Sequence, residues 1–311
     1  MRPVFYTVAV LVVAVNILLA LPQAVNLVQT GISSNNVFAV NIPDTTLNTV
    51  LGASKQNYPP VDQKQAPPPL SAAAAAVYDL SSQSLIYIKD PDKRVPIAST
   101  TKLMTALIGV EYFQGSDILT VPDISYISGS NMGLVAGEKL TFRSLLYGMM
   151  LNSGNDAAFT IALNFPGGYQ NFINTMNSKV ATLGLVNTRF DNPAGFDSPN
   201  HFSSASDMVK IAKKVAENQQ LATVVQTKET TVASTDQSLI HELKNLNKLL
   251  DLPGVLGMKT GFTPAAKENL VTLVEKEGHR VLIVVLGSDD RFGESEKLIN
   301  WTYSNFIWQQ D

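Results

Sequence analysis

The chain has 311 residues, long enough for one large domain or two smaller ones. Hydrophobic residues make up 45% and charged residues 16%, which excludes a wholly disordered or collagen-like chain. The formal net charge of -3 lacks the basic excess of a nucleic-acid-binding protein. The absence of cysteine excludes disulfides, thiolate nucleophiles and thiolate metal sites, and three histidines make a histidine-rich metal centre unexpected.

The N-terminal segment predicts a membrane anchor. Residues 4–21 are almost all apolar, a length that just spans a bilayer. Because Leu19–Ala24 offers a poor signal-peptidase site, we expect residues 1–21 to be a retained transmembrane helix rather than a cleaved signal. No Lys or Arg occurs between Arg2 and Lys55, so the distribution of positive charge predicts that the rest of the chain faces away from the cytoplasm.

Residues 22–69 predict a flexible linker. Seven of the 16 prolines of the chain fall in this segment, ending with the triple Pro67–Pro69. Such a composition buries little apolar surface, so we expect no regular structure there. Residues 70–311 alternate helical and strand-like patterns without a repeat, and we expect them to form one domain.

The first elements of this domain are a hairpin and a helix. Ala72–Leu80 and Leu85–Lys89, separated by a turn-like run of serines, predict two paired strands. Apolar residues at steps of three and four then predict a helix over Ala98–Tyr112. This helix carries Ser99 and Lys102 on one face, because they lie three residues apart.

A second helix and three strands follow. The helix is predicted over Thr141–Met150, and Asn152–Asn155 is a loop-forming break directly after it. The continuous apolar run Val281–Leu286 has the length of a buried strand. We expect Leu256–Gly261 and Asn269–Val274 to complete a central sheet with it.

One pair of residues fits nucleophilic catalysis. A serine hydroxyl becomes a nucleophile when a base takes its proton, and a neutral lysine on the same helical face can be that base. Ser99 is the only serine with a lysine at the third following position, Lys102. Alone, this spacing equally fits a surface helix that happens to carry both residues.

Two further motifs make the match to a catalytic site more specific than the first pair alone. Ser-x-Asn occurs four times in the chain, but only Ser153–Asn155 lies between two helical stretches, where its side chains can face a cleft. The tripeptide Lys259–Gly261 occurs once, and its ordinary interpretation is a strand running into a turn. In this order, the three motifs form the serine acyl-transfer signature of penicillin-binding proteins and class A β-lactamases.

The sequence resembles the low-molecular-mass penicillin-binding proteins, the D-alanyl-D-alanine carboxypeptidases of serine peptidase family S11. The resemblance covers nearly all of residues 72–311. It implies an α/β (α+β) fold of the serine β-lactamase and transpeptidase type, with an antiparallel sheet flanked by helices plus a helical subdomain. Four stretches carry the resemblance: Pro96–Leu107, Leu145–Ala158, Asn192–Met208 and Pro253–Thr263.

The resemblance also implies catalytic roles. Ser99 would attack the carbonyl between two D-alanines and form an acyl-enzyme that water later hydrolyses. Lys102 would be its base, which requires a lowered pKa, and Lys259 and an apolar cleft are the physical means to lower it. Ser153 would relay a proton to the leaving amine. No metal or organic cofactor is implied.

Substrate-binding roles follow from the same resemblance. Asn155 would hold the substrate backbone by its amide, and Lys259 with Thr260 would bind the terminal carboxylate. Gly261 would let the substrate lie against a strand edge. The backbone N–H groups of the nucleophilic serine and of Phe262 would form the oxyanion hole.

Three alternatives remain open at this point. A β-lactamase shares the fold, but Arg189–Asn192 lacks the glutamate with which class A enzymes deacylate. A peptidoglycan endopeptidase would use the same residues, and a non-turnover β-lactam or peptidoglycan receptor is the alternative outside enzymes. Ala265–Asn269 departs from the usual sequence after the third motif, which leaves fine substrate preference open. For His201 and Asp207 we expect structural roles.

The expected partners follow from the leading interpretation. They are peptidoglycan stem peptides ending in D-Ala-D-Ala, β-lactam antibiotics as covalent inhibitors, and the membrane through the N-terminal helix. We expect the catalytic domain on the extracytoplasmic side of a bacterial cell membrane.

Overall fold

The structure is a computed structural model that describes residues 58–308. The predicted anchor and the linker before Tyr58 lie outside the described residues. Within residues 58–308, none of the helices has both the length and the apolar character that crossing a membrane requires.

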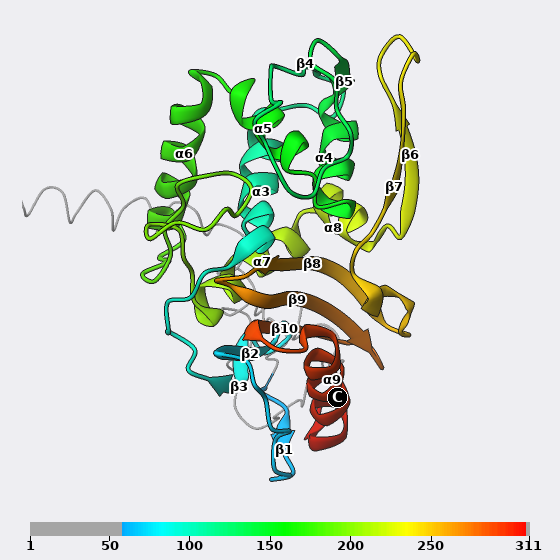
Figure 1. The fold of residues 1–311 in the computed structure, drawn as a ribbon. Helices are drawn as coiled ribbons and strands as arrows, with labels where there is room; N and C mark the ends of the chain where they lie inside the picture. Colours follow the sequence, from blue (N-terminus) through cyan, green and yellow to red (C-terminus); the bar gives the residue numbers. More distant parts are fainter. Residues whose placement is uncertain (1–57, 309–311) are drawn as a thin grey trace, which may run out of the picture. The chain divides into compact units, whose positions relative to one another are not determined.

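A five-stranded antiparallel sheet forms the centre of the domain, in the order β3-β2-β10-β9-β8 (Figure 1). The predicted hairpin and the three predicted strands are confirmed, and the most apolar of them, β10, lies in the middle. The strands are β2 (Ala74–Asp79), β3 (Ser84–Lys89), β8 (Val255–Thr263), β9 (Lys267–Lys276) and β10 (His279–Ser288).

The sheet separates two hydrophobic cores, because successive side chains of a strand point to opposite faces. In β10, the even-numbered residues of 282–286 belong to one core and the odd-numbered residues of 281–285 to the other. Helix α7 (Ala205–Glu217) packs on the first face and α9 (Arg291–Asn305) on the second. Figure 1 shows the two helices on opposite sides of the sheet.

A helical part covers the face that carries α7, and the β6–β7 hairpin stands beside it (Figure 1). Besides α7, the helical part contains η2 (Ala98–Thr101), α3 (Lys102–Tyr112), β4 (Ile118–Thr120), β5 (Lys139–Thr141), α4 (Phe142–Leu151), α5 (Asn155–Leu163), α6 (Gly168–Thr182) and α8 (Gln219–Gln226). The hairpin consists of β6 (Glu229–Ala233) and β7 (Ile240–Lys244). The short η3 (Lys248–Asp251) precedes β8 and packs in the core on the α9 side. The expected single helix over residues 98–112 thus begins as a 3-10 turn. Ala98 has a φ of 46°, outside the helical region, and its carbonyl group lies close to Gly195 of a neighbouring loop.

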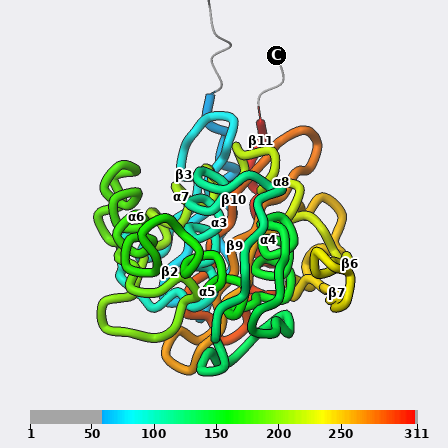
Figure 2. The backbone as a smooth tube through the Cα atoms, turned by 90° about the horizontal axis from the view of Figure 1, so that it is seen from above, coloured from blue at the N-terminus to red at the C-terminus, as the bar shows by residue number. Residues whose placement is uncertain are grey.

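The predicted linker contains a strand that we did not expect. β1 (Val61–Asp62) pairs with β11 (Phe306–Ile307), and Figure 2 shows them side by side. The expectation of no regular structure through residue 69 is therefore wrong for these two residues. A proline-rich composition disfavours local structure, but it does not prevent pairing with a strand that lies about 245 positions further along the chain.

Candidate active site

The first motif places a buried amine on a serine hydroxyl. Ser99 lies in η2 and Lys102 begins α3, so one turn brings Lys102 Nζ to 2.9 Å from Ser99 Oγ. The same Nζ lies 2.8 Å from Asn155 Oδ1 and 2.8 Å from the carbonyl oxygen of Ala194. Lys102 is fully buried. The contact with Asn155 brings the first two motifs together, as the sequence predicted.

The surroundings of Lys102 favour its neutral form. Burial first, and then the charge of Lys259, hold the pKa of Lys102 well below its ordinary 10.5, although Asp156 acts in the opposite direction. The charge of Lys259 is the second cation that the sequence analysis named for this effect. A lysine with such a pKa can accept a proton near neutral pH.

The second motif occupies the junction between α4 and α5. Ser153 is buried and has a φ of 57°. Asn155 Nδ2 donates to the carbonyl oxygen of Ser128 at 2.7 Å, which leaves its second N–H available to a substrate. A Cβ on Gly154 would lie 3.1 Å from the carbonyl oxygen of Gly148, so the middle position of the motif suits glycine.

Asp156 is a site residue that the sequence analysis missed. Its carboxylate accepts backbone N–H groups of residues 132–134 at 3.0 to 3.1 Å and that of Ala157 at 2.8 Å. It therefore fixes the segment 132–134 against the start of α5. The sequence feature that could have indicated it is its place directly after the second motif, as an acidic residue in the first turn of a helix.

The third motif lies on β8, the edge strand of the sheet. Lys259 is buried, and its Nζ donates to the carbonyl oxygen of Thr260 at 3.0 Å. Burial and then the charge of Arg291 lower the pKa of Lys259 to about 7. Thr260 is also buried. Lys259 is thus the second cation that the sequence analysis expected beside Lys102.

Gly261 lets β8 approach the nucleophile. A Cβ there would lie 3.0 Å from the carbonyl oxygen of Ile97 and 3.0 Å from the backbone nitrogen of Ser99. Only glycine leaves the strand room beside η2 without displacing that backbone. The next residue, Phe262, exposes 60% of its surface. The edge strand, the nucleophile and the exposed ring therefore lie along one side of the sheet.

Arg291 is a second residue that the sequence analysis missed. It begins α9, and its Nη1 donates to the carbonyl oxygen of Gly261 at 2.9 Å, while its backbone N–H donates to Glu268 at 2.9 Å. Together with Lys259 it forms a cationic end of β8. No local pattern indicates this position, because it depends on how α9 packs on the sheet.

Asp207 has the structural role expected for it. One of its carboxylate oxygens accepts the backbone N–H of Asn187 and the hydroxyl of Thr188, both at 2.8 Å. It thereby joins α7 to the chain that precedes it, away from the reacting groups.

Comparison with known proteins identifies the family. The model of peptidase family S11, D-alanyl-D-alanine carboxypeptidase, matches residues 61–290. The chain is 31% identical to the D-alanyl-D-alanine carboxypeptidase DacF of Bacillus subtilis, over 76% of this chain and 63% of that protein. It is 31% identical to the D-alanyl-D-alanine carboxypeptidase of Streptomyces sp. strain K15, over 76% and 89% respectively. It is also 30% identical to a D-alanyl-D-alanine endopeptidase of Escherichia coli, over 75% and 78%.

Solved structures show the same fold. The Streptomyces K15 DD-transpeptidase superposes with a TM-score of 0.73 at 31% identity, over 77% of this chain and all of that chain. Penicillin binding protein 5 of Haemophilus influenzae gives a TM-score of 0.71 at 31% identity, over 77% and 73%. The mixed α/β fold of the serine transpeptidase type is therefore confirmed. The chain belongs to the D-alanyl-D-alanine carboxypeptidase family, peptidase family S11.

Proposed function

We propose that this protein is a serine-type D-Ala-D-Ala carboxypeptidase that removes the terminal D-alanine from peptidoglycan stem peptides through an acyl-enzyme on Ser99. The arrangement around the Lys102 amine carries the proposal. The family membership and the relatives named as carboxypeptidases support it.

The hydrogen bonds of Lys102 suit a base. A neutral amine has two N–H donors and one lone pair, and the oxygens of Asn155 and Ala194 can only accept. These two oxygens therefore take both N–H groups of the neutral amine. The lone pair is left for the hydroxyl proton of Ser99, 2.9 Å away.

The reaction then proceeds in two steps. Ser99 Oγ attacks the carbonyl between the two D-alanines, and its proton passes to Lys102 and, through Ser153, to the amine of the leaving D-alanine. The backbone N–H groups of Ser99 and Phe262 stabilise the oxyanion. Water then hydrolyses the ester and regenerates the serine.

The cationic end of β8 sets the orientation of the substrate. The terminal carboxylate lies by Lys259, Thr260 and Arg291, and Asn155 holds the backbone of the stem peptide. An added strand antiparallel to β8 then places the scissile carbonyl beside Ser99, because Gly261 lies against that residue. β-Lactams also carry a carboxylate and an acylating carbonyl, so they act as covalent inhibitors of the same serine.

Lys259 and Arg291 suit a substrate with a free carboxylate directly beyond the scissile bond, as in D-Ala-D-Ala, because both basic side chains are kept there at a cost in burial. A cross-link endopeptidase can use the same residues. Because one relative is a D-alanyl-D-alanine endopeptidase, endopeptidase activity is the alternative that the assay must distinguish.

The test uses the full chain in detergent and follows two signals. D-Alanine release from a peptide ending in Lys-D-Ala-D-Ala and labelling by a fluorescent penicillin are both expected, and both are expected to disappear in Ser99→Ala. Ser206→Ala, a serine substitution on α7, serves as the matched control. Labelling without release would favour the receptor or the endopeptidase, and release that persists in Ser99→Ala would refute the mechanism.

We also propose that residues 1–21 anchor the protein in the bacterial cell membrane, with the catalytic domain outside the cytoplasm. The uncharged apolar run and the absence of Lys and Arg between residues 3 and 54 support this orientation. Deletion of residues 1–21 is expected to move the penicillin-labelled protein from the membrane fraction to the soluble fraction. Retention in the membrane fraction would contradict it.

A further inference from the structure

The carbonyl of Ala194 belongs to a segment with little regular structure. We name residues 191–201 the Ala194 loop; an isolated antiparallel bridge between Arg189 and Phe202 closes its base. This loop supplies one of the two oxygens that orient the Lys102 amine. A loop in such a role needs internal support, because a shift of about 1 Å at a reacting group is costly in rate.

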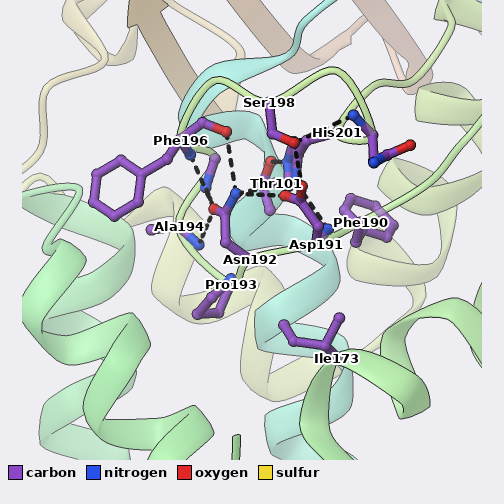
Figure 3. Close-up of polar contacts among 12 residues, drawn as sticks. Thr101, Ile173, Phe190, Asp191, Asn192, Pro193, Ala194, Phe196, Ser198 and His201 are labelled. Atoms are coloured by element: carbon purple, nitrogen blue, oxygen red, sulfur yellow. Dashed lines mark hydrogen bonds and ion pairs between the residues drawn. The ribbon is translucent and has the colours of Figure 1, made fainter. Parts of the chain in front are cut away.

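Asn192 folds the tip of the Ala194 loop. Its side-chain oxygen accepts three backbone N–H groups, those of Ala194 at 3.2 Å, Gly195 at 2.7 Å and Phe196 at 2.9 Å. Its Nδ2 lies 3.1 Å from the carbonyl oxygen of Phe196 (Figure 3). Three N–H groups converging on one buried oxygen fix the turn and thereby the direction of the Ala194 carbonyl.

The folded tip touches the turn that carries the nucleophile. Gly195 has a φ of 97°, and a Cβ there would overlap the carbonyl group of Ala98. At the outer side of the loop, Thr263 Oγ1 donates to Asp197 at 2.7 Å and joins the loop to the end of β8. The Ala194 loop is therefore held between η2 and the substrate-binding strand.

His201 bridges the loop to the start of α3. Its Nε2 lies 2.7 Å from Thr101 Oγ1, and its Nδ1 accepts the backbone N–H of Asp191 at 3.2 Å (Figure 3). The Nδ1 atom also lies 3.3 Å from Asn192 Nδ2. Nδ1 lies 3.2 Å from Asp191 Oδ1 as well, and the Thr101 hydroxyl can either donate to Nε2 or accept from it. The ring thus connects the residue before Lys102 to the start of the turn.

The ring is neutral and closely packed. His201 is 2% exposed, and its ring meets that of Phe190 edge-on, with centroids 5.6 Å apart. Burial lowers the pKa of His201 to about 4, against the opposing charges of Asp191 and Asp197. The bridge therefore keeps one donor and one acceptor throughout the neutral pH range.

We propose that His201 and Asn192 are positioning residues that hold the Ala194 carbonyl on the Lys102 amine and so aim its lone pair at Ser99. Neither residue is placed to touch the substrate, so loss of the bridge slows acylation and leaves non-covalent binding unchanged. The proposal rests on the proposed function, since it concerns the acylation step.

The experiment resolves penicillin acylation into a non-covalent dissociation constant and a first-order acylation rate. His201→Phe keeps the ring contact with Phe190 and removes both hydrogen bonds. His201→Gln keeps one donor and one acceptor. We expect His201→Phe to lower the acylation rate at least tenfold with an unchanged dissociation constant, and His201→Gln to restore it to within about threefold of the wild type.

A second variant tests the same bridge from the other side. Thr101→Val removes the hydroxyl and keeps the shape of the side chain, so it remains informative if His201→Phe does not fold. We expect Thr101→Val to lower the acylation rate as His201→Phe does, and the double variant to be no slower than either, as for one shared interaction.

Two results would overturn this proposal while leaving the function intact. One is an acylation rate in the folded His201→Phe variant within twofold of a wild-type protein that does acylate. The other is an equal loss in His201→Gln and His201→Phe, which would assign the effect to packing. A wild-type chain that is not acylated would instead refute the proposed function itself.

Discussion

At the residue scale, two buried lysines govern the chemistry. Lys102 must be neutral to accept the Ser99 proton, and its lowered pKa makes the neutral form available at a lower pH than in an exposed lysine. Lys259 must be charged to hold a carboxylate, and a pKa of about 7 means that its charge is lost above neutral pH. Acylation by a carboxylate-bearing penicillin is therefore expected to have a bell-shaped pH profile. Stopped-flow rates between pH 4 and 10 test this, and a rate that climbs steadily to pH 10 would contradict it.

Arg291 sets the alkaline side of that profile. Its charge lowers the pKa of Lys259, so Arg291→Gln is expected to move the alkaline limb to higher pH and to weaken penicillin binding about tenfold. Arg291→Lys keeps a charge at this position and is expected to leave the limb near its original place. An alkaline limb that is identical in the glutamine variant would show that another group titrates there.

The burial of Lys259 also has a cost in stability. Its pKa is about 7 in the folded protein and near 10.5 in an unfolded chain, so the unfolded chain binds more protons between these values. The free energy of unfolding therefore gains a contribution that rises from pH 7 to pH 10. Lys259→Met is expected to abolish carboxypeptidase activity, to raise Tm at pH 6 by several degrees and to flatten this rise. A lower Tm in calorimetry would refute the argument.

At the element scale, the junction between α4 and α5 depends on one carboxylate. Asp156 accepts N–H groups from residues 132–134, and an amide at this position would turn N–H donors toward some of them. Asp156→Asn is expected to lower the free energy of unfolding by about 2 kcal/mol or more and to slow acylation through Asn155. Urea unfolding measures the first effect. Asp123→Asn, at an exposed turn, is the control and is expected to change little.

The elements that could be predicted are those whose sequence patterns are local. The hairpin and β10 could be predicted because their alternating or continuous apolar patterns are local. Ser99 and Lys102 could be paired because one helical turn separates them. Ala194 could not be found, because it contributes a backbone carbonyl that any residue carries. The 3-10 start at Ala98 lies against Gly195, a residue almost a hundred positions away, and such a contact leaves no local signal in the sequence.

At the scale of the whole molecule, the short N-terminal strand stabilises the domain from a distance. Gln65 N–H donates to Asn305 Oδ1 at 2.8 Å, and Trp301 Nε1 donates to the carbonyl oxygen of Gln65 at 3.2 Å. Deletion of residues 58–69 would leave the buried side chain of Asn305 without the Gln65 N–H, and Trp301 Nε1 without its acceptor. β1 lies beyond the sheet from the helical part that carries Ser99 (Figure 1).

A protein beginning at residue 70 is therefore expected to have a Tm several degrees below that of one beginning at residue 58. At a temperature well below both transitions, the two are expected to be acylated by penicillin at equal rates. Differential scanning calorimetry and a labelling time course measure the two properties. Equal Tm values would show that the β1–β11 pair contributes nothing.

The pairing of β1 with β11 also means that the order of the elements along the chain could be changed without changing the fold. Val61 lies opposite Ile307 in an antiparallel pair, so the two ends of the described part emerge side by side. A short peptide could join them, and the chain could be opened instead at the tip of the β6–β7 hairpin. Circular permutation would then leave every contact of the acylating centre in place, with the third motif preceding the first along the chain.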